Sequence, residues 1–270
     1  MSDSSPTDFH QAAAHVYDAL LGLKATGQIR HGASLQALQQ LVETPLTESI
    51  APVSSPTPMP KSSDKAARMN ALRTRALACT LCPHLAASRT QVVFGVGNID
   101  TELMFVGEAP GADEDEQGEP FVGRAGELLT KIIKAMDYER SDIYIGNVLK
   151  CRPDMPPGES GNRKPKPTEM ATCLPYLKEQ IEIIRPRVLV GLGATAMQGL
   201  IGADEPMGTL RGRWHEFEGI PLMATYHPAY LLRNQSLSEK RKVWEDMLMV
   251  LEKLGRPISE KQRAFFTAAK

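Results

Sequence analysis

The sequence lacks the features that mark several large classes of protein. It has four cysteines in 270 residues, too few for a secreted domain held by disulfides. No apolar run is long enough to cross a membrane, and the start, MSDSSPTDFHQ, lacks the basic-then-apolar order of a secretion signal. We therefore expect a soluble, cytoplasmic protein with no membrane partner.

An excess of charge of one sign is also missing. The chain has 31 Lys+Arg and 32 Asp+Glu, a formal net charge of -1, so no overall positive field attracts nucleic acid. Any contact with DNA must then come from local groups of basic residues. Hydrophobic residues make up 42% of the chain, enough for one substantial core and an appendage.

The first 63 residues differ from the rest of the chain. Apolar residues recur at steps of three and four between Phe9 and Leu23, which predicts an amphipathic helix in an N-terminal arm, residues 1–42. Proline and serine dominate residues 43–63, which predicts a linker. The arm is either a helix that packs on the main body or a docking segment for a protein partner, and the sequence leaves both open.

Strand and helix patterns alternate over residues 64–270. Short apolar runs predict strands at 103–108, 143–148, 188–193 and 220–226. Helical patterns cover 64–78, 123–136, 168–184, 194–200 and 238–254. The strands are apolar throughout, which indicates burial on both faces and therefore an α/β domain whose parallel sheet is covered by helices.

Polar residues follow three of these strands. Glu108 lies in a glycine-rich turn after the first strand, Asn147 ends the second, and His227 follows the fourth. The carboxyl ends of parallel strands are where such sheets bind ligands, so we expect the three side chains to converge. Taken singly, each also has a structural explanation: a capping acid, a turn-forming amide and a histidine fixed by the next proline.

Two other motifs are weaker candidates. Residues 191–196, GLGATA, resemble the start of a dinucleotide-binding loop but lack its third glycine and the later acidic residue, so a tight strand-to-helix turn is predicted. The acidic run at 112–119 has no second carboxylate cluster to complete a cation site. We expect it to be a solvated loop.

The four cysteines form two groups. Cys79 and Cys82 make a CxxC motif, and Cys151 and Cys173 follow much later. Four thiolates from two segments suit a tetrahedral zinc ion and an iron–sulfur cluster equally well, and four buried thiols without a metal are the alternative. A metal site here would brace the loop that follows Asn147.

Three motifs together resemble the family 4 uracil-DNA glycosylases, the iron–sulfur branch of that superfamily: GEAPGADEDEQGEPFVGRAG at 107–126, NVLKCRP at 147–153 and HPAYLLR at 227–233. The resemblance covers about residues 68–255 and leaves the first 63 outside. It implies a three-layer α/β/α sandwich with a central four-stranded parallel sheet. It also implies removal of uracil from DNA by hydrolysis of the N-glycosidic bond, by a monomer acting at the nucleoid.

The same resemblance assigns the metal and the base pocket. It places a [4Fe–4S] cluster on the four cysteines, with zinc as the less favoured occupant. It makes Ala109 and Pro110, beside Glu108, the first wall of the pocket. Phe121 is then the ring that stacks on the base, although a phenylalanine in this context also suits a core.

Base recognition is assigned to two further residues. The amide of Asn147 matches the hydrogen-bond polarity of uracil N3–H and O4, which cytosine reverses, so two unmet groups would exclude cytosine. Glu114 corresponds to a position beside uracil C5, where its side chain would exclude the methyl group of thymine. A carboxylate in an exposed loop is the alternative for Glu114.

The resemblance also divides the catalytic work. His227 is placed to donate to uracil O2 as the base leaves with negative charge, and Glu108 to stabilise the cationic sugar or act on water. Leu231 and Leu232 are candidates for a wedge that fills the gap left by the flipped nucleotide, with packing the alternative for one of them. The basic residues expected to hold DNA are Lys150, Arg152, Arg163, Lys164, Lys166, Arg211, Arg213 and Arg233.

The sequence departs from the family pattern between the third and fourth cysteines, where residues 153–160 lengthen the loop. A related branch has a histidine in this loop that bonds covalently to the sugar, but this loop contains none, so a covalent trap is not expected. The competing function is a non-catalytic, metal-stabilised nucleic-acid-binding module with an N-terminal partner-docking arm. A binder of that kind has no need of Glu108 and His227 at matching strand ends.

Overall fold

The computed structural model describes residues 62–156, 158, 159 and 161–267. The predicted N-terminal arm, residues 1–42, lies outside the described residues, as does most of the linker. Helix α3 (Ser62–Leu77) begins two residues before the predicted domain start. No helix in the described ranges is long and apolar enough to span a membrane.

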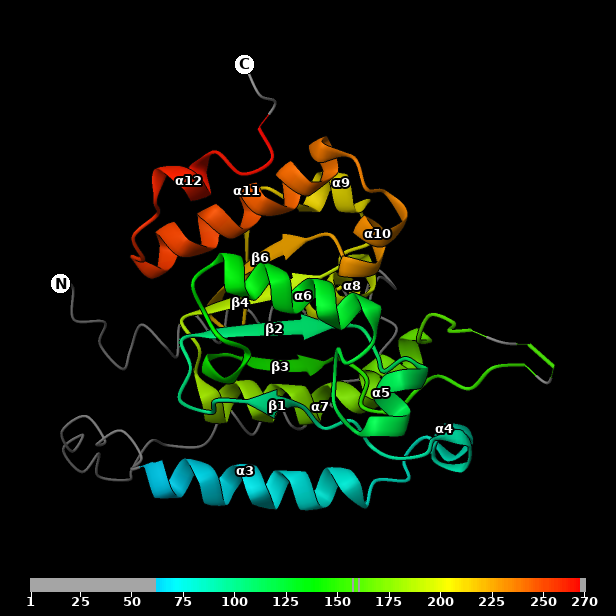
Figure 1. The fold of residues 1–270 in the computed structure, drawn as a ribbon. Coiled ribbons are helices and arrows are strands. Elements are labelled where there is room, and N and C mark those ends of the chain that lie inside the picture. The colour runs from blue at the N-terminus through cyan, green and yellow to red at the C-terminus, as the bar shows by residue number, and fades with distance from the viewer. Residues whose placement is uncertain (1–61, 157, 160, 268–270) are drawn as a thin grey trace, which may run out of the picture. The chain divides into compact units, whose positions relative to one another are not determined.

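The centre of the domain is a mixed sheet, six-stranded within the described residues (Figure 1). Its strands, in spatial order, are β1 (Val96–Gly97), β3 (Tyr144–Asn147), β2 (Leu103–Gly107), β4 (Val188–Leu192), β6 (Ile220–Thr225) and β5 (Trp214–Phe217). Neighbours from β3 to β6 pair in parallel, whereas the edge strands β1 and β5 pair antiparallel. The α/β class is confirmed, but the sheet is not the purely parallel four-stranded one that was expected.

The other helices are α4 (Pro83–Ser88), α5 (Ala112–Gln117), α6 (Arg124–Ala135), α7 (Pro167–Ile184), α8 (Ala194–Ile201), α9 (Met207–Leu210), α10 (Pro228–Arg233), α11 (Leu237–Leu254) and α12 (Glu260–Arg263), with a 3-10 turn η1 (Arg140–Asp142). The five predicted helices are confirmed, each within two residues at both ends. The acidic run was wrongly expected to be a loop. It forms α5, which begins after Gly111 and ends at Gly118 in the left-handed conformation.

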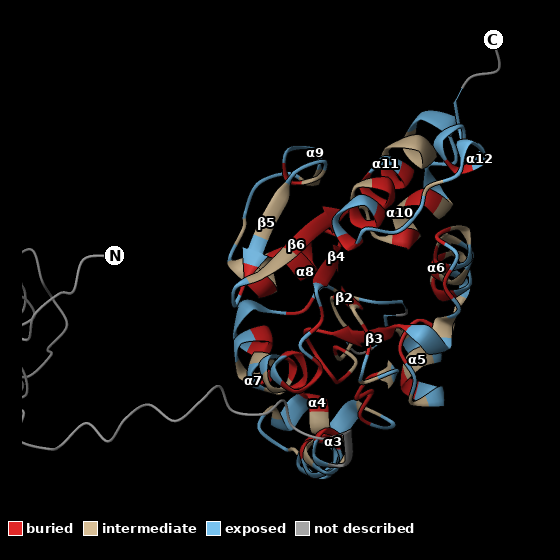
Figure 2. Cartoon of the chain, turned by 90° about the vertical axis from the view of Figure 1, so that its left-hand side faces the viewer, coloured by how far each residue is buried: buried red, intermediate tan, exposed pale blue. Residues whose placement is uncertain are grey.

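Two apolar cores cover the two faces of the sheet. Met104, Val106 and Leu189 face a core shared with α3, α7 and α8, whereas Leu103 and Phe105 face a core shared with α6 and α11. Successive strand residues therefore alternate between the two cores, as the pleat of a strand requires. Figure 2 shows the central strands buried and β5 partly exposed.

The strand register brings the predicted site residues to one edge of the sheet. Gly107, which precedes Glu108, pairs with Asn147 in the parallel β2–β3 ladder. Leu192 at the end of β4 pairs with Thr225 at the end of β6, two residues before His227. In Figure 1 the arrowheads of β2, β3 and β6 point to the end of the sheet where α5 and α10 lie.

Candidate active site

A cavity of about 360 Å³ lies at the carboxyl ends of these strands. Its walls include all seven residues that were assigned to base binding and catalysis: Glu108, Ala109, Pro110, Glu114, Phe121, Asn147 and His227. Gly111, Ala125, Asn162, Arg163, Lys164, Ala229 and Arg233 complete the lining. A cavity of this size can hold a single nucleobase with part of its sugar.

Asn147 lines this cavity and has a buried, unpartnered acceptor in its side chain. The residue is 2% exposed, and its Oδ1 has no hydrogen-bond partner within the described residues. Gly107 explains how the amide fits: a Cβ on Gly107 would lie 2.3 Å from Asn147 Oδ1 and 2.7 Å from the ring of Phe121. Because a buried acceptor without a donor is costly, Oδ1 is suited to a donor supplied by a ligand.

Phe121 is held in an uncommon backbone conformation. Its φ is 56°, in the left-handed region that residues with a Cβ seldom adopt. Gly126 in α6 lies directly against it, since a Cβ there would be 1.7 Å from the carbonyl oxygen of Phe121. The ring is 7% exposed and contacts the core beneath α6 as well as the cavity. Phe121 is therefore a core residue that also forms part of the cavity wall, so the two interpretations do not exclude each other.

Glu114 ties the two halves of the cavity loop together. Its Oε2 accepts from the backbone N–H of Gly111 at 3.0 Å, and its Oε1 accepts from those of Val122 at 3.1 Å and Gly123 at 3.3 Å. The carboxylate is half-buried in the cavity wall, not free in an exposed loop. It thereby fixes the segment that carries Phe121 relative to the start of α5.

His227 has a defined tautomer. Its Nδ1 accepts from the backbone N–H of Ala229 at 3.1 Å and caps α10, so Nε2 carries the proton of the neutral ring. Burial lowers the pKa of His227 below its ordinary value, Glu108 opposes this shift, and Arg233 adds to it. The site therefore favours a neutral imidazole with an Nε2–H donor.

The GLGATA segment supports this histidine. Gly193 has φ +92°, and a Cβ there would lie 3.1 Å from Cβ of His227. Its N–H donates to the carbonyl oxygen of Thr225 at 2.8 Å. The segment is the tight strand-to-helix turn that was predicted. Its Gly193 lies against the histidine, and the absence of a Cβ on this glycine permits the close approach.

The loop between the third and fourth cysteines contributes three cavity residues that the sequence did not indicate as base contacts: Asn162, Arg163 and Lys164. Arg163 is anchored by Glu169, whose Oε1 and Oε2 it contacts at 2.7 and 3.0 Å, and it also pairs with Asp154. Although burial favours the neutral acid, hydrogen bonds from Arg163 and the Lys166 N–H lower the pKa of Glu169 to about 2.

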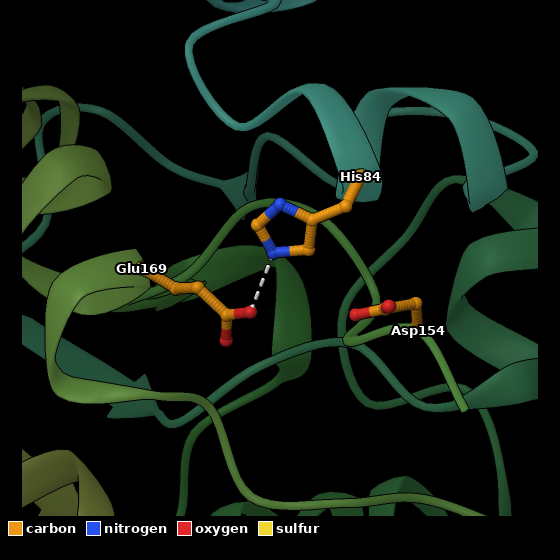
Figure 3. Close-up of side chains that lie close together, drawn as sticks. All are labelled: His84, Asp154 and Glu169. Carbon is orange, nitrogen blue, oxygen red and sulfur yellow. Dashed lines mark hydrogen bonds and ion pairs between the residues drawn. The ribbon is translucent and has the colours of Figure 1, made fainter. Parts of the chain in front are cut away.

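His84, Asp154 and Glu169 form a group with potential ligand atoms within 4.8 Å of one another (Figure 3). His84 Nε2 lies 2.8 Å from Glu169 Oε1, and Arg163 pairs with both carboxylates. The guanidinium already supplies the positive charge that a cation would bring. We therefore interpret the group as an ion-pair network that fixes the cysteine loop.

The four cysteines come together on the side of the cavity formed by this loop. Cys82, Cys151 and Cys173 share an apolar cluster, and Arg89 links Cys79 to it, because Nη2 of Arg89 donates to the carbonyl oxygen of Cys79 at 2.8 Å. Arg89 Nη1 donates to Cys151 Sγ at 3.1 Å, and the Lys150 N–H donates to Cys173 Sγ at 3.2 Å. Burial raises the pKa of Cys173 to about 11, so a metal would have to displace the thiol protons.

The donor set fits both metals that the sequence left open. All four potential ligand atoms are thiol sulfurs, and two of them accept hydrogen bonds, Cys151 from Arg89 and Cys173 from the Lys150 N–H. Four thiolates accompanied by N–H donors suit an iron–sulfur cluster as well as a zinc ion.

One of the expected DNA contacts, Lys150, is wrong because the side chain is buried, and two others pair with carboxylates of the protein. Lys150 is 2% exposed and enclosed by protein, and Arg163 is committed to Glu169 and Asp154. Arg211 makes a two-pronged pair with the buried Asp246. Arg152 is half-buried, whereas the other four stay exposed: Lys164, Lys166, Arg213 and Arg233.

The two wedge candidates differ in exposure. Leu231 is 4% exposed, so packing accounts for it. Leu232 is half-buried and remains the wedge candidate.

Comparison with known proteins places the chain in a family. The model of the uracil DNA glycosylase superfamily matches residues 94–248. The type-4 uracil-DNA glycosylase of Thermotoga maritima is 46% identical over 181 residues, 66% of this chain and 91% of the relative. That of Archaeoglobus fulgidus is 39% identical over 198 residues, 70% of this chain and 93% of the relative. A type-5 uracil-DNA glycosylase of Pyrobaculum aerophilum is 27% identical over 190 residues, 58% of this chain and 80% of the relative.

The chain therefore belongs to the uracil DNA glycosylase superfamily. Within it, the chain groups with the type-4 uracil-DNA glycosylases, to which its identity is clearly higher than to the type-5 protein. The resemblance inferred from the three sequence motifs is thus confirmed.

Proposed function

We propose that the cavity binds a uracil turned out of DNA and that its residues cleave the bond between the base and deoxyribose. The reaction class follows from the family: the chain is a uracil-DNA glycosylase, a DNA-repair enzyme that yields free uracil and an abasic site. The residue roles rest on one observation, the buried and unpartnered Oδ1 of Asn147 in a cavity shared with Glu108, Phe121 and His227. A purely binding module is not favoured.

Recognition of the base follows from hydrogen-bond polarity. Asn147 Oδ1 accepts from uracil N3–H, and its Nδ2 donates to O4. Cytosine presents an acceptor and a donor at these places, so both groups of the amide would remain unmet, at about 1–3 kcal/mol each. Glu114, held by three backbone amides, closes the wall beside C5 against the methyl group of thymine.

Catalysis acts on the charges that develop as the bond breaks. The electron pair of the C1′–N1 bond leaves with uracil, and the neutral His227 donates Nε2–H to O2, where negative charge accumulates. Glu108 faces the electron-poor sugar, and water adds to C1′ while its proton is lost to a base. The ring of Phe121 compensates for the stacking that the base lost on leaving the duplex.

Release of free uracil from a single-stranded oligonucleotide with one uracil tests this assignment. Asn147→Ala should lower kcat/KM by about 100-fold, the result expected from losing two hydrogen bonds, whereas Asn70→Ala on the exposed face of α3 should match the parent. His227→Ala should lower kcat by about 100-fold or more. Full activity in either cavity variant would overturn its assigned role.

We also propose a [4Fe–4S] cluster as the occupant of the cysteine site. Cys79, Cys82, Cys151 and Cys173 would hold it, and its contribution is structural, because it would join α4, α7 and the cavity loop. Iron content and visible absorption of anaerobically purified protein measure it directly. Colourless, iron-free protein with full activity and an unchanged Tm would reject the cluster.

The same proposal extends to the whole chain. The domain, residues 64–270, holds every cavity residue, and uracil-containing DNA reaches it through exposed basic residues around the cavity and the wedge candidate Leu232. We infer a monomer that works at the nucleoid, with the arm, residues 1–42, as a docking segment for a protein partner. Size-exclusion chromatography of the full chain checks the monomer, since a dimer would elute at twice the expected mass.

A further inference from the structure

Lys150 is a buried lysine that the proposed reaction does not use. It was expected on the surface, yet it is 2% exposed and belongs to the largest fully buried side chains. Its Nζ donates to the carbonyl oxygen of Asn147 at 2.9 Å and to Oε1 of Gln180. A charged group is enclosed in a protein only where its hydrogen bonds are met, so these two acceptors define where the ammonium stands.

The second acceptor is itself fixed. Gln180 in α7 is fully buried, and its Nε2 donates to the carbonyl oxygen of Phe94 at 3.0 Å and to the hydroxyl of Tyr144 at 2.9 Å. Tyr144 begins β3, the strand that ends at Asn147. The ammonium thus connects the carboxyl end of β3 to a helix through a network in which each side-chain polar group has at least one partner.

The main chain around Lys150 runs along the cavity and the cysteine site. The N–H groups of Val148 and Leu149 donate to the carbonyl oxygens of Gly107 and Glu108, both at 2.9 Å. The N–H of Lys150 donates to Cys173 Sγ at 3.2 Å, and the next residue is Cys151. One turn, residues 147–150, therefore carries the base-reading amide at its start and touches the cysteine site at its end.

We propose that Lys150 is a positioning residue for uracil recognition, because its ammonium holds the end of β3 and thereby keeps the side-chain amide of Asn147 in the cavity wall. This inference rests on the proposed role of Asn147. Lys150 does not touch the base, and it acts through the backbone carbonyl of Asn147.

Lys150→Met removes the donor while keeping an unbranched side chain of similar length. The carbonyl of Asn147 and Oε1 of Gln180 then lose their donor inside the protein, and the turn relaxes. Displacement of a binding group by about 1 Å can cost about 100-fold in rate, so kcat/KM should fall by about 10- to 100-fold. The inhibition constant of free uracil should rise by about tenfold, since recognition is weakened without DNA or chemistry being involved.

Lys65 provides a matched control. It is also buried, at 9% exposure, and its Nζ donates to a backbone carbonyl, that of Ile184, at 3.3 Å, and to Asp100 at 3.0 Å. Ile184 ends α7 before β4 begins, so this lysine lies at the amino end of the parallel strands, away from the cavity. Lys65→Met should lower Tm and leave both kcat/KM and the inhibition constant of uracil within twofold of the parent.

The measurements are made on the full chain with its iron content recorded. The proposal is supported if Lys150→Met keeps the iron content and visible absorption of the parent but binds uracil more weakly, while Lys65→Met binds uracil as the parent does. It is overturned if Lys150→Met has a lower Tm but parental uracil affinity, or if its uracil affinity falls only when its iron content also falls. Failure of the parent to release uracil would instead refute the proposed function.

If Lys150→Met does not accumulate as folded protein, Gln180→Met tests the proposal in its place. It removes one acceptor of the ammonium and leaves Lys150 in place, so uracil affinity should fall in the same direction by a few-fold. Parental affinity in folded Gln180→Met would overturn the proposal.

Discussion

The rings of Phe121 and His227 lie with their centroids 5.5 Å apart and their planes 31° from parallel. They come from segments far apart in the sequence, the loop before α6 and the end of β6. Both also line the cavity. The two rings are therefore close enough for one ligand in the cavity to contact both, which is what the proposed stacking and leaving-group roles require.

Phe121→Leu should separate stacking from packing. Leucine keeps an apolar side chain under α6 but removes the flat ring, and loss of base stacking costs about 1–3 kcal/mol, or about 10- to 100-fold in kcat/KM. Phe217→Leu in β5, which is equally buried but outside the cavity, should lose stability and keep kcat/KM. Equal activity losses in the two variants would show that Phe121 is only a core residue.

His227 should make folding stability depend on pH. Burial, with Arg233, holds the pKa of His227 below its ordinary value, while Glu108 opposes the shift. Below about pH 6.5 the unfolded chain then binds a proton that the folded protein refuses, so stability falls as pH decreases toward the lowered pKa. His227→Asn keeps a capping acceptor but does not titrate.

Urea unfolding of both proteins from pH 7.5 to pH 5 measures the effect. The free energy of unfolding of the parent should decrease relative to that of His227→Asn as pH falls. Curves that stay parallel over the whole range would show that His227 titrates alike in the folded and unfolded states.

Exposed basic residues around the cavity should set the salt dependence of DNA binding. Lys164 and Arg233 line the cavity and are exposed, and each phosphate contact contributes about −0.9 to the slope of log K against log salt. Lys164→Ala and Arg233→Ala should each make the slope shallower by about 1. Lys261→Ala, exposed on α12, should leave it unchanged, and three identical slopes would place the DNA elsewhere.

Glu108→Gln should lower kcat by about 100-fold and change KM little, because the carboxylate acts on charge or a proton that appears only as the bond breaks. Steady-state kinetics of uracil release separates the two constants. Glu116→Gln, on the exposed side of α5, is the control. A rise in KM at unchanged kcat would make Glu108 a binding group only.

The sequence predicted those elements whose pattern of apolar residues matches their burial in the folded domain. Strands β2, β3, β4 and β6 were located to within two residues because both of their faces are buried. The edge strands were not predicted from the sequence. Strand β1 has only two residues, and β5 has the sequence WHEF, which is half-exposed and contains no apolar run. Helix α5 has no apolar stripe, and its capping glycines and Glu114 determine it instead.

The site shows the same limit. Glu108, Asn147 and His227 were identifiable because parallel strands bring their carboxyl ends to one edge. The burial of Lys150 could not be predicted from the sequence, because its partner Gln180 is 30 residues away and a lysine is ordinarily exposed. The same holds for Asn162, which the folding of a long loop brings to the cavity.

Gly107→Ala tests whether the geometry of the cavity floor matters by itself. The glycine has no left-handed φ, so alanine brings no backbone strain, but its Cβ would lie 2.3 Å from Asn147 Oδ1 and 2.7 Å from Phe121. Both side chains must move, and kcat/KM should fall by about 100-fold. Gly208→Ala in α9 is the control, because its Cβ would meet only the Tyr226 hydroxyl oxygen, at 3.8 Å, an ordinary contact outside the cavity lining. Parental kcat/KM in Gly107→Ala, measured by uracil release, would mean that neither Asn147 nor Phe121 needs its observed position.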